Sequence, residues 1–314
     1  MIENTGKRWK GLFITIFLGL IPTAAMSEYA LDIQKISPNV YALVGELTQR
    51  SPENYANNST HGVIISDEGV ILVDPGGSFL GAQQIDKAIK SLTDKPVKYV
   101  INTGGQDHRW LGNGYFKQHG AHIITSTAAL EDHHERADIH MSRLNQLIGG
   151  MLESTVPVYA DETFDSEMKL QLGDVALEIY HVGAAHTLGD SFVWLPEQKV
   201  MFTGDIVYVE RMLGTGPAKN VKSWVEVFEK MAAYQPVTVV PGHGHAVSLE
   251  TAQKDTYEYL VFLIDNISGM LDEGVELLDA VELDQSQFSY LEVFDEISRK
   301  NAQGVYEQLE FDSF

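Results

Sequence analysis

The chain alternates short apolar runs with polar turn segments along most of its length. Runs rich in β-branched residues and bounded by Gly, Pro, Asp or Asn are typical of buried strands. The sequence predicts strands at 40–44, 62–66, 70–74, 97–101, 121–125, 168–172, 175–181, 191–195, 200–202 and 237–240. Helical spacing of apolar positions predicts helices over 81–92, 126–147 and 221–234, and a helical region from Leu249 onward.

Neither an internal repeat nor a long low-complexity linker interrupts this pattern. We therefore expect one compact α/β domain over residues 28–250 and a C-terminal helical extension over 251–314. Apolar residues recur at helical spacing in the extension, at Tyr259, Leu260, Phe262, Leu263 and Ile267. They are expected to pack against the domain or against a partner subunit, so a homo-oligomer formed through these helices is one alternative.

The first residues of the chain have the layout of a secretory signal peptide. Cations at Lys7, Arg8 and Lys10 precede an apolar run over 12–21, and small residues follow it. A membrane-spanning helix needs roughly 20 apolar residues, and this run is shorter. We expect residues 1–26 to be a removable leader, with an uncleaved membrane anchor as the alternative. The mature protein would then be periplasmic or secreted and free of the membrane.

Composition limits the partners and the metal ligands. The 314 residues include no cysteine, so any metal must be held by His, Asp, Glu or water. The formal charge is −22, and it becomes −24 once a leader with three cations and one anion is removed. Nucleic acid and anionic membrane surfaces are therefore not expected partners, because both bind to cationic faces. A small-molecule substrate or ligand is the expected partner.

Metal-competent side chains directly follow several of the predicted strands. His186, Asp205 and His243 lie in Gly-Ala-Ala-His-Thr-Leu-Gly-Asp, Thr-Gly-Asp and Pro-Gly-His-Gly segments, respectively. Glycine lets the backbone turn sharply at a strand end, so we expect these side chains to face one shared cleft. Asp74 ends a further strand and is expected to be a buried acceptor that braces the neighbouring loop or a ligand histidine.

The loop after strand 97–101 completes an ordered set of motifs. It reads Asn-Thr-Gly-Gly-Gln-Asp-His-Arg-Trp-Leu-Gly-Asn from Asn102 to Asn113. Together with Asp74 and the three later segments, it resembles the metallo-β-lactamase-fold superfamily over roughly residues 33–245. This resemblance implies a four-layer αββα sandwich with the active site along one edge of the paired sheets. It also implies a hydrolase whose zinc or iron ions activate water.

The loop departs from the family's pattern, which reads Asn-Thr-His-x-His-x-Asp-His. Matched without gaps, Gly104 and Gln106 replace the first two His, His108 replaces Asp, and Arg109 replaces the last His. The first ion site then keeps only His186 of its three His ligands. The second site keeps two His and one carboxylate, which is sufficient for Zn²⁺ or Fe²⁺.

The resemblance therefore implies one degenerate metal site. Its candidate ligands for a single divalent ion are His108, His186, Asp205 and His243. His186 would ligate the ion or orient substrate, and Asp107 would ligate or act as a base. A register shifted by one residue would instead use Asp107 and His108 as the family's Asp-His pair. Gln106 and Asp74 are expected to support the ligands through hydrogen bonds.

Arg109 divides two hypotheses about function. In the first, the chain is an exported metal-dependent hydrolase that acts on an unidentified small molecule, with Arg109 and Asp107 at the catalytic centre. In the second, the Arg109 guanidinium replaces the metal and pairs with Asp205 or Asp107. The chain would then be an inactive binding or accessory protein with an Arg109-centred anion pocket and no metal.

Another histidine-rich run lies in the predicted helix 126–147. It reads Glu-Asp-His-His-Glu-Arg and includes His133 and His134. A charged run of this kind is typical of a solvated helix face, so we assign it no role at the site.

Overall fold

The structure is a computed structural model that describes residues 1–2, 30–218 and 220–312. Most of the expected leader, residues 1–26, therefore lies outside the described residues. Over the described ranges, no helix is both long and apolar enough to span a bilayer.

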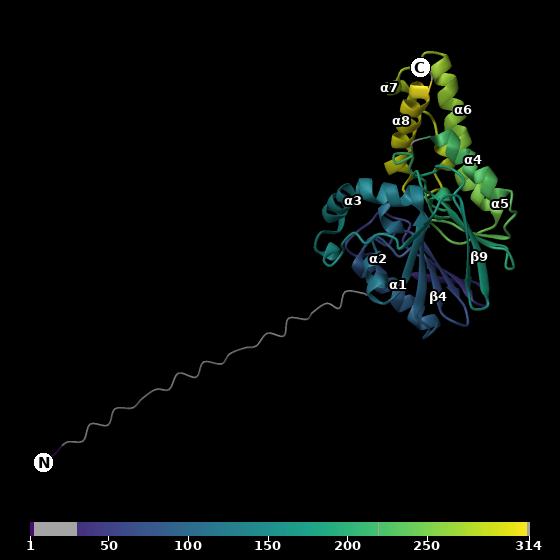
Figure 1. Cartoon of the computed structure of the whole chain (residues 1–314). Coiled ribbons are helices and arrows are strands. Elements are labelled where there is room, and N and C mark those ends of the chain that lie inside the picture. The colour runs from purple at the N-terminus through teal and green to yellow at the C-terminus, as the bar shows by residue number, and fades with distance from the viewer. Residues whose placement is uncertain (3–29, 219, 313–314) are drawn as a thin grey trace.

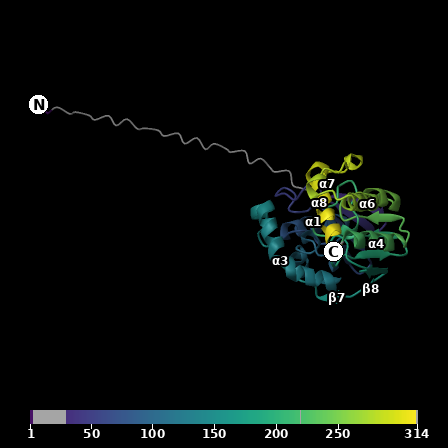
Figure 2. The same cartoon turned by 90° about the horizontal axis from the view of Figure 1, so that it is seen from above.

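Two mixed β-sheets pack face to face, and helices cover their outer faces (Figures 1 and 2). The first sheet follows chain order, with β1 (Asp32–Ser37), β2 (Val40–Val44), β3 (Thr60–Ile65), β4 (Val70–Val73), β5 (Val97–Asn102), β6 (His122–Ser126) and β7 (Glu162–Phe164). The second, in spatial order, contains β12 (Thr238–Val240), β11 (Val200–Phe202), β10 (Phe192–Leu195), β9 (Val175–Tyr180) and β8 (Glu167–Leu172). This arrangement confirms the predicted αββα sandwich.

The central strands are apolar because both of their faces are covered. All four residues of β4 are buried, as continuous Val, Ile and Leu runs predict for interior strands. One face of each sheet contributes to a shared layer between them, which includes Ile71, Ile101, Ile124, Ile179, Val193 and Phe202. Burial of this layer holds the two sheets in one relative orientation.

Parallel pairing places the candidate site at one edge of the sandwich. Strand β4 runs parallel to β5 and β5 to β6, and in the second sheet β11 runs parallel to β12. Their carboxyl ends therefore lie at a common edge, where Asp74, the loop after Asn102, Asp205 and His243 follow directly.

Helices on the outside bury one apolar face each. The first sheet is covered by α1 (Phe79–Leu92), α2 (Asn113–Gln118) and α3 (Thr127–Ile148). The second is covered by α4 (Val221–Ala232) and α5 (Leu249–Ala252), and α6 (Glu258–Asp272) continues from α5 beyond the sheet. Helix α4 begins at Asn220, whose side chain accepts from the Ser223 N–H, and it buries Trp224 and Phe228 against the second sheet.

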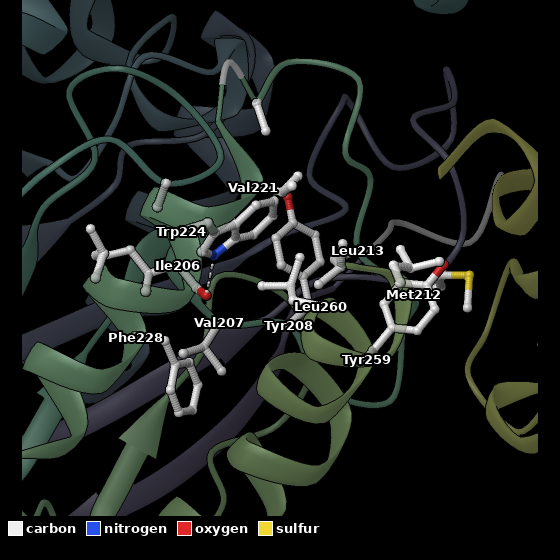
Figure 3. Close-up of a cluster of buried hydrophobic side chains, with 14 of the residues drawn as sticks. Ile206, Val207, Tyr208, Met212, Leu213, Val221, Trp224, Phe228, Tyr259 and Leu260 are labelled. Carbon is white, nitrogen blue, oxygen red and sulfur yellow. Dashed lines mark hydrogen bonds between the residues drawn. The ribbon is translucent and has the colours of Figure 1, made fainter. Parts of the chain in front are cut away.

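The C-terminal helices stand on the edge of the sandwich that carries the site (Figure 1). They include α6, α7 (Leu277–Ala280) and α8 (Phe294–Asp312), and α8 lies over the middle of the molecule in Figure 2. Tyr259 and Leu260 of α6 are buried in the cluster shown in Figure 3, where Trp224 donates to the Ile206 carbonyl at 2.9 Å. These apolar positions pack within the chain, and assembly of subunits through these helices stays a prediction.

Candidate metal centre

The loop after β5 is braced at both ends. Asn102 and Asn113 exchange two side-chain hydrogen bonds of 2.9 Å, which close the loop at its base. The Asp74 carboxylate accepts from the Thr103 backbone N–H at 2.8 Å and from its hydroxyl at 2.8 Å. Between these anchors, a 3₁₀ helix over Asp107–Arg109 turns the chain and directs three consecutive side chains to different partners.

Three buried side chains converge from separate strand ends. The ligand atoms of His108, Asp205 and His243 all lie within 4.8 Å of one another. His108 Nε2 lies 3.1 Å from Asp205 Oδ2, and His243 Nε2 lies 3.3 Å from Asp205 Oδ1. The structure thus brings together three of the four candidate ligands in the ungapped register. Asp107 is not part of this group.

The hydrogen bonds of His243 fit a cation between the rings and the carboxylate. Its Nδ1 lies 2.7 Å from the Asn58 carbonyl oxygen, which can only accept, so Nδ1 carries the ring proton. Burial holds the pKa of His243 well below its ordinary value, so the ring is neutral and Nε2 has a lone pair. That lone pair faces the Asp205 carboxylate. A divalent cation bound to both atoms would relieve the repulsion between them.

His108 has two competing partners at Nδ1. Asp107 Oδ1 lies 3.1 Å away and can accept a proton from Nδ1, which leaves the Nε2 lone pair free for a metal. The Arg50 guanidinium contacts both Asp107 and His108 Nδ1, and as a pure donor it favours the opposite tautomer. Burial opposes ionisation of Asp107, but the Arg50 charge outweighs it and holds the Asp107 pKa below its usual range. Asp107 is therefore a poor base.

Arg109 lies in a buried network of acceptors. Its side chain is fully buried, and it donates to Asp205 Oδ1 at 2.6 Å, Asp74 Oδ2 at 2.9 Å and the Gly242 carbonyl at 2.8 Å. Pairing with Asp205 agrees with the second hypothesis. The guanidinium does not line either of the two cavities described below, and an Arg109-centred anion pocket and a catalytic role for this residue stay predictions.

The positive charge of Arg109 lowers the pKa of Asp205, the carboxylate between the two histidines. Burial opposes ionisation of Asp205, but Arg109, followed by His108, outweighs it and holds the Asp205 pKa well below its ordinary value. Asp205 Oδ2 receives no hydrogen bond of good geometry, although His108 Nε2 is near it. The ionised carboxylate thus has one oxygen committed to Arg109 and one available to a cation.

Comparison with known proteins agrees with this fold and motif order. The family model described as the metallo-beta-lactamase superfamily matches residues 56–243. The chain belongs to that superfamily. It is similar to the metallo-beta-lactamase type 2 proteins of Elizabethkingia meningoseptica, at 24% identity over 73% of this chain and 86% of that protein, and of Bacteroides fragilis, at 22% identity over 75% and 90%.

Solved structures show the same fold. The metallo-beta-lactamase from Pontibacter korlensis superposes with a TM-score of 0.60 at 23% identity, covering 73% of this chain and 98% of that chain. The family match ends at residue 243. The C-terminal helices therefore lie outside the part of the chain that carries the family's motifs.

Side chains of other elements lie beside Gly104 and Gly105, the glycines at the start of the loop. A Cβ placed on Gly104 would lie 2.2 Å from Asp190 Oδ1, and one on Gly105 would lie 1.7 Å from Asp132 Oδ2. Gln106 faces α3, where Arg136 donates to its side-chain oxygen at 3.4 Å. Side chains of other elements therefore fill the space beside the two glycines.

Helix α3 packs against the loop beside Gly104. This corrects the expectation that the histidine-rich run of this helix is a solvated face. His133 is fully buried, stacks on Trp110 with ring centroids 4.4 Å apart and lies 2.9 Å from the Gly104 carbonyl through Nε2. Only His134 of the pair is exposed, so the run is not a wholly solvated face. His140 lies on the same buried face of the helix.

A cavity of about 110 Å³ opens beside the three converging side chains, and we name it the metal cavity. Its lining includes Arg50, Gln106, His108, His186, Arg211 and His243. His186, the fourth candidate ligand, lies outside the close group, and among the described residues its ring accepts or donates no hydrogen bond. Burial lowers its pKa to about 4, so the ring is neutral.

Sequence reasoning did not identify Arg50 and Arg211, the two cations of the metal cavity. Arg211 is 5% exposed, and no carboxylate of the described residues lies within 4 Å of its guanidinium. It donates instead to the Leu47 carbonyl at 2.7 Å and to Gln49 at 3.1 Å. The signal in the sequence was compositional: five of the seven arginines of this acidic chain lie in or near the site.

Proposed function

We propose that this chain is a metal-dependent hydrolase with one divalent ion, Zn²⁺ or Fe²⁺, held by His108, Asp205 and His243. The observation that carries the proposal is the neutral His243 ring, which directs its free Nε2 at the Asp205 carboxylate. Two imidazoles and one carboxylate are a sufficient ligand set for either ion. The proposed site is mononuclear because Gly104 and Gln106 supply no ligands for a second ion.

An ion bound there would supply Lewis acidity and a water of lowered pKa. The protein's own groups would do the rest. His186 is neutral, and its buried Nδ1 leaves Nε2 to meet the cavity, where it can accept a hydrogen bond from water or substrate and orient it. The uncompensated charge of Arg211 would hold an anionic group of the substrate next to the reacting bond. Arg109 would act as a positioning residue by keeping Asp205 ionised.

We do not extend β-lactam hydrolysis from the named relatives to this chain. Those proteins are called metallo-beta-lactamases, but the identities are 22–24%. In this chain, the loss of the first two His positions also changes the space in which a substrate would bind. The substrate we propose is a small molecule with at least one anionic group.

Metal analysis of protein purified without chelator tests the proposal. We expect about one equivalent of a transition metal in the parent chain and a large loss in His243→Ala and Asp205→Asn. His245→Ala is the matched control, because His245 is half exposed and pairs with Glu210 and Asp32 at the surface. Less than about 0.2 equivalents in the parent chain would rule out the metal-dependent hydrolase.

A second candidate function is anion binding without turnover. It is favoured by Arg50 and Arg211, two cations that line the metal cavity beside three histidines. This candidate moves the cationic centre of the second hypothesis from Arg109 to these two residues. It predicts a metal-free protein that still binds phosphate or carboxylates, and the same metal analysis separates it from the hydrolase.

We also propose export of the mature chain to the periplasm or the medium. The support is the order of cationic, apolar and small residues over 1–26. Mass spectrometry of the protein made in a secreting host should give a chain that begins close to Glu28. A chain that keeps its first residues would contradict the proposal.

A further inference from the structure

A second and larger cavity lies beside the metal cavity, and we name it the outer cavity. Its volume is about 340 Å³, within the range of ligand sites, and its lining includes Asp132, Arg136, Ile139, Arg143, Leu188 and Pro217. One wall is a face of α3, on which residues 136, 139 and 143 follow each other at helical spacing. The other wall is formed by the loop around Leu188 and the segment at Pro217.

The two cavities are neighbours. Pro217 lines both of them. Thr187 lines the outer cavity and adjoins His186, which lines the metal cavity. Gln106 of the metal cavity accepts from Arg136 of the outer cavity at 3.4 Å. A molecule of moderate length can therefore contact both cavities at once.

The outer cavity carries an uncompensated positive charge. Arg136 is neutralised by a bidentate pair with Asp132. Arg143 differs, because no carboxylate of the described residues lies within 4 Å of its guanidinium. In a chain with a formal charge of −22, an unpaired arginine at a cavity wall attracts anions locally against the overall field.

Apolar side chains lie next to that charge. Ile139 is 46% exposed and Leu188 is 41% exposed, and both line the outer cavity, Ile139 from α3 and Leu188 from the loop after β9. A single exposed apolar side chain is common on protein surfaces, but two that line the same cavity can bury an apolar ligand. An alkyl chain or a ring between them would remove both side chains from water.

We propose that the outer cavity binds the far end of an amphipathic anion, in which a carboxylate or phosphate is joined to an apolar chain or ring. Arg143 binds the anionic end, Ile139 and Leu188 contact the apolar part, and the other end reaches the metal cavity. This inference rests on the proposed function, because it names the class of its substrate. It also assigns binding residues that lie outside the metal centre.

Calorimetric titration of the metal-loaded protein with octanoate and with octyl phosphate tests the proposal. We expect both anions to bind, and neutral 1-octanol and cationic octylamine to bind at least about tenfold more weakly. Arg143→Gln should weaken octanoate binding about tenfold, and Arg143→Lys should restore part of it. Octyl phosphate binding without octanoate binding would identify a phosphate end, and the reverse a carboxylate end. Either supports the site.

Matched variants separate local binding from general charge. Arg299→Gln removes the same charge from α8, where Arg299 pairs with Glu282 at the surface, and it should leave octanoate binding unchanged. Ile139→Ser should weaken octanoate but not acetate, while Leu278→Ser, at an 80% exposed position, should change neither. Equal losses in Arg143→Gln and Arg299→Gln, or equal binding of octanol and octanoate, would overturn the proposal.

The two proposals fail in different ways. Protein that holds metal but binds neither octanoate nor octyl phosphate contradicts the outer-cavity inference alone. Protein that lacks metal but binds octanoate through Arg143 contradicts the hydrolase alone, because Arg143 is not a metal ligand.

Discussion

The two sides of the loop after β5 differ in what holds them. At Gly104 and Gly105, the backbone approaches Asp190 and Asp132 so closely that an added Cβ would clash with their carboxylates unless these shift. At Asp107–Arg109, three consecutive side chains point into a buried network with Asp74, Asp205 and Arg50. One side is held by steric fit around glycine, and the other by paired charges.

This difference shows that carboxylates from other elements fill the space beside the two glycines. The Asp190 carboxyl lies where a side chain at position 104 would begin, and Thr187 fixes it through its N–H at 2.6 Å. On the other side, Arg109 compensates Asp74 and Asp205 together. Each side therefore has its own set of stabilising contacts. Variants on the two sides should therefore differ in how much they change the free energy of unfolding and in how that change depends on pH.

The largest effect is expected from Arg109→Ala. Removal of a fully buried guanidinium leaves Asp74 and Asp205 without a counter-charge, which costs about 3–5 kcal/mol of unfolding free energy. Urea denaturation followed by circular dichroism measures it. Arg299→Ala, the surface control, should cost about 0–1 kcal/mol. Equal effects of the two variants would mean that the charged network does not hold this side of the loop.

An intermediate effect is expected from the pH response of Asp190. Burial, with Asp205 adding to it, raises the pKa of Asp190 from 3.8 to about 8. Between these values the folded state keeps a proton that the unfolded chain has lost, so this group makes stability fall as pH rises. We expect a loss of about 2–3 kcal/mol from pH 5 to pH 8, within the limit of about 1.4 kcal/mol per pH unit for one group.

Asp190→Asn should remove this pH dependence, as measured by thermal unfolding across the same range. Asp161→Asn is the contrasting control. Burial opposes ionisation of Asp161, but hydrogen bonds from Lys117 and the Ile123 N–H lower its pKa. Its contribution is therefore present above the ordinary carboxyl pKa and is lost as pH falls. An unchanged profile in Asp190→Asn would show that the carboxyl is ionised in the folded protein.

The contrast between the two sides also explains what the sequence could predict. Most strands and the order of the strand-end motifs follow from local patterns, and the candidate set His108, Asp205 and His243 follows from the family's motif. The filling of the space beside Gly104 and Gly105 could not be predicted, because it depends on Asp132 and Asp190, which approach the glycines only in the folded chain.

Helix α3 misled the sequence interpretation for a related physical reason. Its buried face carries His133, Ala137, His140 and Leu144, so imidazoles stand where apolar residues would mark a core face. Arg50 escaped notice because it lies in a polar loop, and only the tertiary fold brings it to Asp107. From the sequence alone, polar residues that are buried next to a functional site are interpreted as surface residues.

The smallest effect is expected from restoring the first ligand with Gly104→His. Gly104 does not have a left-handed backbone conformation, so the obstacle is the Asp190 carboxyl 2.2 Å from the new Cβ. We expect a cost of about 1–2 kcal/mol in unfolding free energy and no added metal. Gly150→His is the control, because a Cβ there meets nothing within 4 Å.

In an Asp190→Ser background most of the cost of Gly104→His in unfolding free energy should disappear, since the shorter side chain leaves room. With Gln106→His added, the metal content should rise from about one equivalent toward two, because His186 completes the three-His set. If the restored chain stays at one equivalent although Asp190 is gone, Asp132 and α3 rather than Asp190 keep the first ion site closed.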